Sequence, residues 1–122
     1  MGGAGTVVLA VSASALLAHH SVLPYDGSSA TTLTGTVTKV LWQNPHAYIN
    51  LDVVASGSHE RWIIESEGPV ALERLGWTKS TLTPGDAITV VGARARDGST
   101  RLRCATVTLG ARQLPCFGSG GI

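Results

Sequence analysis

Between Met1 and Tyr25 the sequence contains no Lys, Arg, Asp or Glu. Over the whole chain charged residues make up only 14%, and the formal net charge is +1. Because binding to nucleic acid or to an anionic membrane surface depends on an excess of positive charge, we expect neither partner. The sequence also has no phosphate-binding glycine loop and no zinc signature. Ser21 and His20 are neighbours in the sequence, but this adjacency does not indicate a catalytic triad. The sequence therefore favours a protein that is not an enzyme.

The uncharged start of the chain has the form of a secretory signal peptide. Its apolar run is shorter than the roughly 20 residues that a membrane-spanning helix needs, and small residues suited to cleavage follow it. Cleavage is expected after Ala15, which has Ala13 two positions before it, or after Ala18. The absence of a basic residue before the apolar run departs from the usual pattern. We expect residues 1–18 to be a signal peptide, the protein to be periplasmic or secreted, and the mature chain to have no membrane span.

The remaining sequence predicts a polar arm over 19–30, one domain over 31–112 and a Gly-rich tail over 113–122. Alternation of apolar and polar residues predicts five strands, at 31–40, 47–55, 60–66, 87–95 and 101–109. A short helix is expected to begin at Pro69, between the third and fourth strands. This order predicts a mainly β fold, a five-stranded OB-like Greek-key barrel with one short helix between strands 3 and 4.

The chain has two cysteines, Cys104 and Cys116. An even number of cysteines in an oxidising compartment favours one disulfide between them. The alternative is a pair that ligates a metal, but no Cys or His lies nearby at the spacing of a zinc site. We expect the disulfide.

The histidines are the candidates for metal binding. Cleavage after Ala18 would leave His19 at the new N-terminus, where the free amine and the imidazole form a chelate. His46, in the loop after the first predicted strand, would add a third nitrogen, with His20 as a substitute for His19. Planar nitrogen ligation favours Cu(II), so copper is the expected metal if one is bound. The simpler interpretation is that His19 and His20 begin a solvated arm and that His46 hydrogen-bonds within its own turn.

Aromatic and amide side chains near the second predicted strand are the candidates for ligand binding. Strands 2 and 3 of an OB barrel, with the adjoining loops, usually form its binding face. Trp42, Asn44 and Tyr48 fall on or near that face. Trp62 and Trp77 are expected in the core, and the alternative for Trp42 is that it fills one end of the barrel.

Two glutamates raise the question of acid–base chemistry. Glu65 and Glu67 lie two positions apart and so share one face of a strand. A pair of carboxylates can catalyse glycoside hydrolysis, but this spacing alone is weak support. A solvated strand face is the favoured interpretation.

Seven segments together carry a resemblance to a known family: Ala18–Ser21, Leu33–Val40, Trp42–Ala47, Glu65–Pro69, Leu75–Thr78, Pro84–Asp86 and Gly92–Gly98. Their succession resembles a family of small exported bacterial proteins classed as a domain of unknown function. The resemblance covers nearly the whole expected mature chain. It implies an exported OB-like module and no particular activity; the cysteine pair and the weak leader are departures from the family pattern.

Two functional hypotheses follow from the sequence. The first is a non-enzymatic binding or accessory module, exported from the cytoplasm, whose partner is an unknown small ligand or another envelope protein. The alternative is a copper-binding protein that uses its mature N-terminal histidine and His46.

Overall fold

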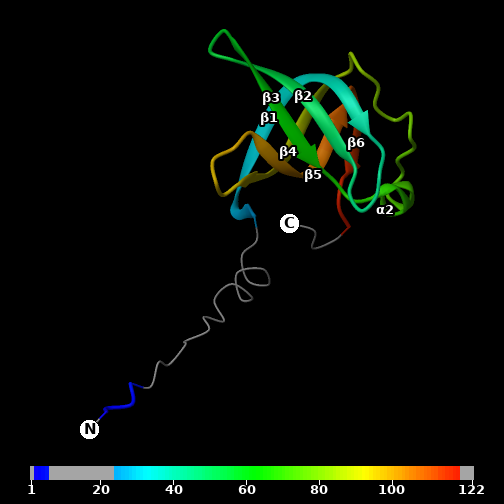
Figure 1. The fold of residues 1–122 in the computed structure, drawn as a ribbon. Helices are drawn as coiled ribbons and strands as arrows, with labels where there is room; N and C mark the ends of the chain where they lie inside the picture. Colours follow the sequence, from blue (N-terminus) through cyan, green and yellow to red (C-terminus); the bar gives the residue numbers. More distant parts are fainter. Residues whose placement is uncertain (1, 6–23, 119–122) are drawn as a thin grey trace.

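The computed structural model describes residues 2–5 and 24–118, and it consists mainly of β-strands with one short helix (Figure 1). The elements in chain order are β1 (Tyr25–Leu41), β2 (Tyr48–Ala55), β3 (Ser58–Glu65), α2 (Pro69–Arg74), β4 (Ala87–Ala95), β5 (Arg101–Leu109) and β6 (Arg112–Pro115). In this described part, none of the helices has the length and apolar character needed to cross a membrane.

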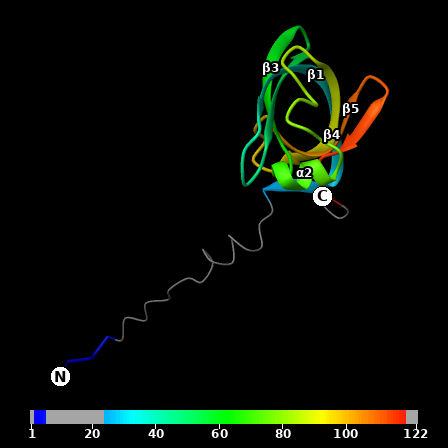
Figure 2. The same ribbon diagram turned by 90° about the vertical axis from the view of Figure 1, so that its right-hand side faces the viewer.

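The strands form one sheet that closes on itself. The order across the sheet is β3-β2-β1-β4-β5-β6, and a further pairing joins β3 to β5. All neighbouring strands run antiparallel except β3 and β5, which are parallel. Seen from the side, the strands curve around a common interior and α2 lies at one end of the ring (Figure 2). The mainly β, OB-like fold expected from the sequence is therefore confirmed, with the helix between β3 and β4.

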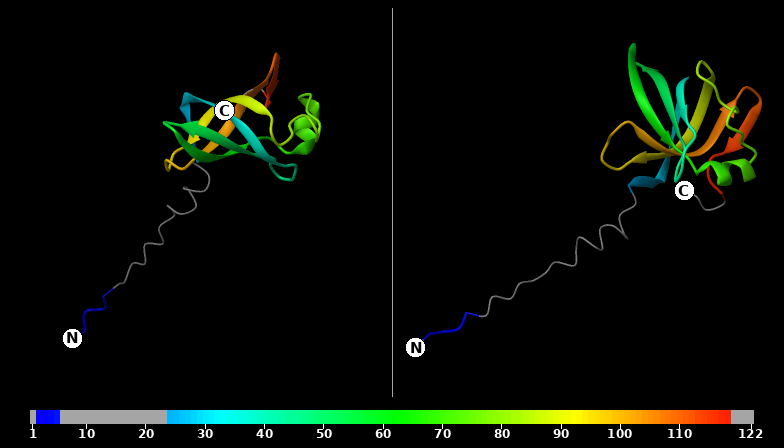
Figure 3. Two further views of the ribbon diagram at one scale, coloured as in Figure 1. Left: turned by 90° about the horizontal axis from the view of Figure 1, so that it is seen from above. Right: turned by 45° about the vertical axis from the view of Figure 1, so that its right-hand side comes forward.

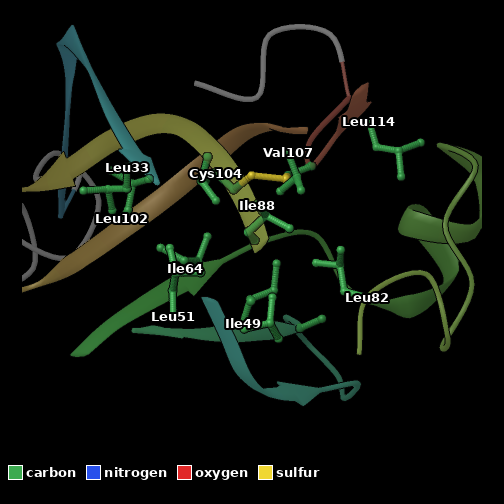
Figure 4. Close-up of a cluster of buried hydrophobic side chains, with 14 of the residues drawn as sticks. Leu33, Ile49, Leu51, Ile64, Leu82, Ile88, Leu102, Cys104, Val107 and Leu114 are labelled. Carbon is green, nitrogen blue, oxygen red and sulfur yellow. A yellow bond between two sulfur atoms is a disulfide. The ribbon is translucent and has the colours of Figure 1, made fainter. Parts of the chain in front are cut away.

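Alternating residues of the strands fill the interior (Figure 4). On β2, the side chains of Ile49, Leu51 and Val53 point inward and are buried. Beyond the strands, α2 contributes Leu72, and the connection that follows it contributes Leu82 to the same core. Burial of such alternating apolar side chains is the main force that holds a barrel of this size together. Trp62 and Trp77 are also buried in this core, as expected.

Two glycines allow the strands to approach closely where the sheet bends. A side chain at Gly35 would overlap the backbone carbonyl oxygen of Asp52, and one at Gly92 would overlap that of Arg103. The pairing of β4 with β5 shifts register immediately before Gly92. Glycine at such positions is typical of barrel corners and bulges.

The strands at the two ends of the domain differ from the sequence prediction. β1 begins at Tyr25, six positions before the predicted start at Thr31, and Tyr25 pairs with Ala95 of β4. The register shifts between Asp26 and Thr31, so the alternation there is interrupted and the strand is hidden in the sequence. β6 was not predicted, because it has only 4 residues and ends in a proline.

A disulfide joins β5 to the residue that follows β6. Cys104 and Cys116 are both fully buried, and their Cα atoms lie 5.6 Å apart. The backbone N–H of Cys116 also donates a hydrogen bond to the carbonyl oxygen of Ala105, at 2.8 Å. The expected pairing of the two cysteines is confirmed, and it fixes the C-terminal strand to the barrel.

Replacing both cysteines by alanine should lower the free energy of unfolding by about 3 kcal/mol, because the cross-link closes a loop of 12 residues in the unfolded chain. Urea unfolding of the wild type and of the Cys104→Ala/Cys116→Ala variant measures the difference. Reductant should destabilise the wild type and leave the variant unchanged. Equal stability of the two proteins under oxidising conditions would contradict the stabilising role.

Candidate functional site

The outer side of β2 and β3 carries two rows of side chains, most of them polar. Along this side, three residues of β2 face three residues of β3 in the pairs Tyr48 with Glu65, Asn50 with Ile63, and Asp52 with Arg61. Their inward neighbours, such as Leu51 and Ile64, are buried in the core. The alternation that builds the barrel therefore also sets out a mainly polar face, in which Ile63 is an exposed apolar residue.

One part of this face is hollowed into a groove of about 780 Å³. Outward residues from three strands line it: Thr38, Lys39, Asn50, Asp52, His59, Arg61 and Ile63. We call this hollow the β1–β3 groove. Its volume falls in the range of sites that bind small molecules or short segments of chain.

A β-bulge in β1 shapes the groove. Val37 pairs with Leu51 and Lys39 pairs with Asn50, so that Thr38 is an additional residue in β1. Because Val37 points inward, regular alternation would also point Lys39 into the barrel. The bulge instead places both Thr38 and Lys39 on the outer side, where both are exposed.

The charges in the groove are unevenly balanced. Its one carboxylate, Asp52, is held by His59, whose Nδ1 lies 2.8 Å from Asp52 Oδ2. Within residues 24–118, neither Lys39 nor Arg61 forms a salt bridge or a side-chain hydrogen bond. The groove therefore presents two cations that have no acidic partner in the described part of the protein.

A second group of polar residues surrounds Glu65. Glu65 pairs with Tyr48, next to the pair of Asn50 and Ile63 on the outer side of β2 and β3. Tyr48 Oη donates a hydrogen bond of 3.5 Å to Glu65 Oε1, and His46 Nδ1 lies 4.0 Å from the same oxygen. Tyr25, at the start of β1, also hydrogen-bonds Glu65. We call these four residues the Glu65 cluster. Glu65 was expected on a solvated face, but its side chain is only 17% exposed.

The surroundings of Tyr25 change its acidity. Burial raises the pKa of Tyr25 to about 12, and both the hydrogen bond to Glu65 and the negative charge of Glu65 act in the same direction. Arg101 opposes these effects by favouring the phenolate. The phenol of Tyr25 is thus a proton donor to Glu65 over the physiological pH range.

His46 is fixed by the backbone. Its Nδ1 lies 3.0 Å from the carbonyl oxygen of Ser66. Because a carbonyl oxygen can only accept, this contact requires the proton on Nδ1 and leaves Nε2 as the free acceptor of a neutral ring. The ring of Phe117 lies beside it, with centroids 6.4 Å apart.

The structure brings together some of the residues that the sequence singled out. His46 and Tyr48 meet at Glu65, whereas Asn44 is exposed in the loop before β2. Trp42 is partly buried against the core, which agrees with a filler role. His19 and His20 lie outside the described residues. Among residues 2–5 and 24–118, no three His, Cys, Asp or Glu side chains come close enough together to hold a metal ion.

Neither cation of the groove, Lys39 or Arg61, was predicted from the sequence. The bulge that turns Lys39 outward cannot be recognised from alternation alone, and the groove that Arg61 lines depends on how β1, β2 and β3 are arranged in the sheet. The polar, outward positions of β2 were the one usable signal.

Fold and groove together define a class of small OB-like barrel with a polar groove on the outside of strands 1 to 3. A model of the family DUF6152, described as a family of unknown function, matches residues 7–103. The chain belongs to this family, as the resemblance in its sequence implied. No curated protein matches the chain significantly.

Substituting Glu65 by glutamine should lower the pKa of Tyr25 from about 12 toward its ordinary value of 10.0, because the negative charge that opposes ionisation is removed. The chain has only two tyrosines, so the phenolate absorbance of the wild type, Glu65→Gln and Tyr25→Phe proteins isolates this group. Glu67→Gln is the matched control and should leave the titration unchanged.

The same shift makes stability depend on pH. Because the folded-state pKa is above the unfolded value of 10.0, the stabilisation is fully present below pH 10 and is lost as the pH rises toward about 12. The Tyr25→Phe variant should lack this loss. A wild-type titration in which both tyrosines ionise near pH 10 would contradict the assignment.

Proposed function

We propose that this protein is an exported, non-enzymatic binding module and that the β1–β3 groove is its binding site. The observation that carries the proposal is the groove itself, an open hollow of about 780 Å³ on the outer side of β1, β2 and β3. This is the face that OB-type barrels commonly use to bind their ligands. The groove combines charged, amide and apolar side chains, a composition suited to recognition.

The composition of the groove favours binding over catalysis. Its lining includes neither a serine nor a cysteine, and its one hydroxyl, that of Thr38, donates to the carbonyl oxygen of Asn50 at 3.2 Å. The Asp52–His59 pair can accept and donate hydrogen bonds without a nucleophile to activate. Export is supported by the apolar leader and by the buried disulfide, which is typical of an oxidising compartment.

Thermal unfolding of the purified processed protein tests the binding site. The ligand panel contains organic anions, neutral saccharides and short peptides. A ligand at about 100 times its Kd stabilises a folded protein by about 2.7 kcal/mol, so at least one class should raise Tm by about 10 °C. Asn50→Trp fills the groove and should abolish that rise, while Gln113→Trp on β6 should not. A ligand-induced rise that persists in Asn50→Trp, or turnover of a panel compound, would contradict the proposal.

Copper binding is the second candidate, and the fixed orientation of His46 favours it. Histidine ligands of metals usually donate their second ring N–H to a carbonyl or carboxylate, as the Nδ1–H of His46 does to Ser66. Its Nε2 would be the ligand, and the mature N-terminal histidine would supply the rest of the site. Tyr25, which begins β1, already contacts Glu65 next to His46, so the arm enters the barrel near this ring.

N-terminal sequencing of the exported protein followed by copper titration tests this alternative. If the mature chain begins at His19, His46→Ala should weaken copper binding at least about tenfold. His59→Ala is the matched control and should bind copper as the wild type does. A mature chain that begins at Leu16, or copper affinity unchanged in His46→Ala, would exclude the site.

A further inference from the structure

We infer that the β1–β3 groove takes an extended acidic peptide segment of a partner protein, held through its carboxylates by Lys39 and Arg61. This inference rests on the proposed function, because it names the ligand class of the same groove. It follows from the charge of the groove, from the spacing of its two cations and from the nature of the surface between them.

The two cations are available to a ligand. Both are exposed, and neither forms a salt bridge within residues 24–118. The planar guanidinium of Arg61 is suited to paired hydrogen bonds with a carboxylate, and Lys39 adds a second positive charge. Asp52 forms no salt bridge with either cation, and its single negative charge leaves the lining with an excess of positive charge.

Their spacing suits two separated carboxylates. Lys39 pairs with Asn50 on β2, and Arg61 pairs with Asp52, two residues further along the same strand. Lys39 on β1 and Arg61 on β3 are therefore separated by two inter-strand spacings across the sheet and by two residues along it, which places their Cα atoms ~12 Å apart. In an extended peptide, acidic residues four positions apart point to the same side and are ~13 Å apart. The two spacings match.

The surface of the groove favours a peptide over the other anions. A nucleic acid carries closely spaced phosphates, whereas the groove offers only two separated cations, with Asp52 on the strand between them. The indole of Trp62, which borders the groove, is only 3% exposed, so it offers little aromatic surface on which a sugar ring could stack. Ile63 is 37% exposed and offers an apolar contact to a side chain of the peptide. The side-chain amide of Asn50 adds a polar partner.

Fluorescence anisotropy with a labelled peptide tests the inference. The probe is an extended peptide that has two aspartates four positions apart with a valine midway, and its control has asparagine in place of both aspartates. The acidic peptide should bind, and Lys39→Gln and Arg61→Gln should each weaken it about tenfold. Lys79→Gln removes the same charge from an exposed position outside the groove and should have no such effect. Raising NaCl from about 50 to about 300 mM should also weaken binding.

Three results would overturn the inference. The first is equal binding of the acidic and the amide peptide. The second is that Lys39→Gln and Arg61→Gln bind the acidic peptide as Lys79→Gln does. The third is that trigalacturonate binds more tightly than the peptide and that its binding depends on Lys39 and Arg61. In the third case the ligand is an acidic saccharide, and the proposed function as a binding module is retained. If no ligand of any class is sensitive to Asn50→Trp, the proposed function fails as well.

Discussion

The closure of the sheet depends on a short parallel contact between β3 and β5. Only three residue pairs form it, from Ile63 with Arg101 to Glu65 with Arg103. Without this contact the sheet would be open, with β3 as a free edge strand exposed to non-specific pairing. Two further bonds support it, because the N–H of Ile63 donates to the carbonyl of Thr100, and the Thr100 hydroxyl donates to the carbonyl of Arg61. The polar face of β2 and β3 has its curvature because this contact holds β3 in place.

The two ends of the described domain pack beside this contact. Tyr25 reaches Glu65 and Arg101, one residue on each side of the closure. Phe117 packs under Arg103, with the guanidinium carbon 4.2 Å from the ring centroid. Such cation–π contacts contribute about 0.5–2 kcal/mol, depending on how far they are removed from water. Tyr25 and Phe117 therefore add contacts beside the short β3–β5 pairing, and the disulfide fixes the segment that carries Phe117 to β5.

Much of the fold could be predicted from the sequence, because burial follows the alternation of apolar residues. Ile88 and Val90 of β4 are buried as their spacing indicates, and the bounds of β4 and β5 agree with the prediction. The first residues of β1 could not be predicted, since Tyr25 is placed by contacts with distant residues of β3 and β5. The site was less predictable for the same reason. A groove depends on how three strands lie side by side, and the position of Lys39 depends on a bulge that does not appear in the pattern.

One consequence follows from where the chain enters and leaves the barrel. The first residues of β1 and the residues after β6 lie at the same end of the ring (Figure 3). Because both points lie at one end of the ring, a linker could join them without crossing the barrel, which makes the domain a candidate for circular permutation, or for insertion as a cassette into a loop of another protein. In either arrangement the β1–β3 groove would stay intact, because the residues that line it fall within 38–63, away from both points.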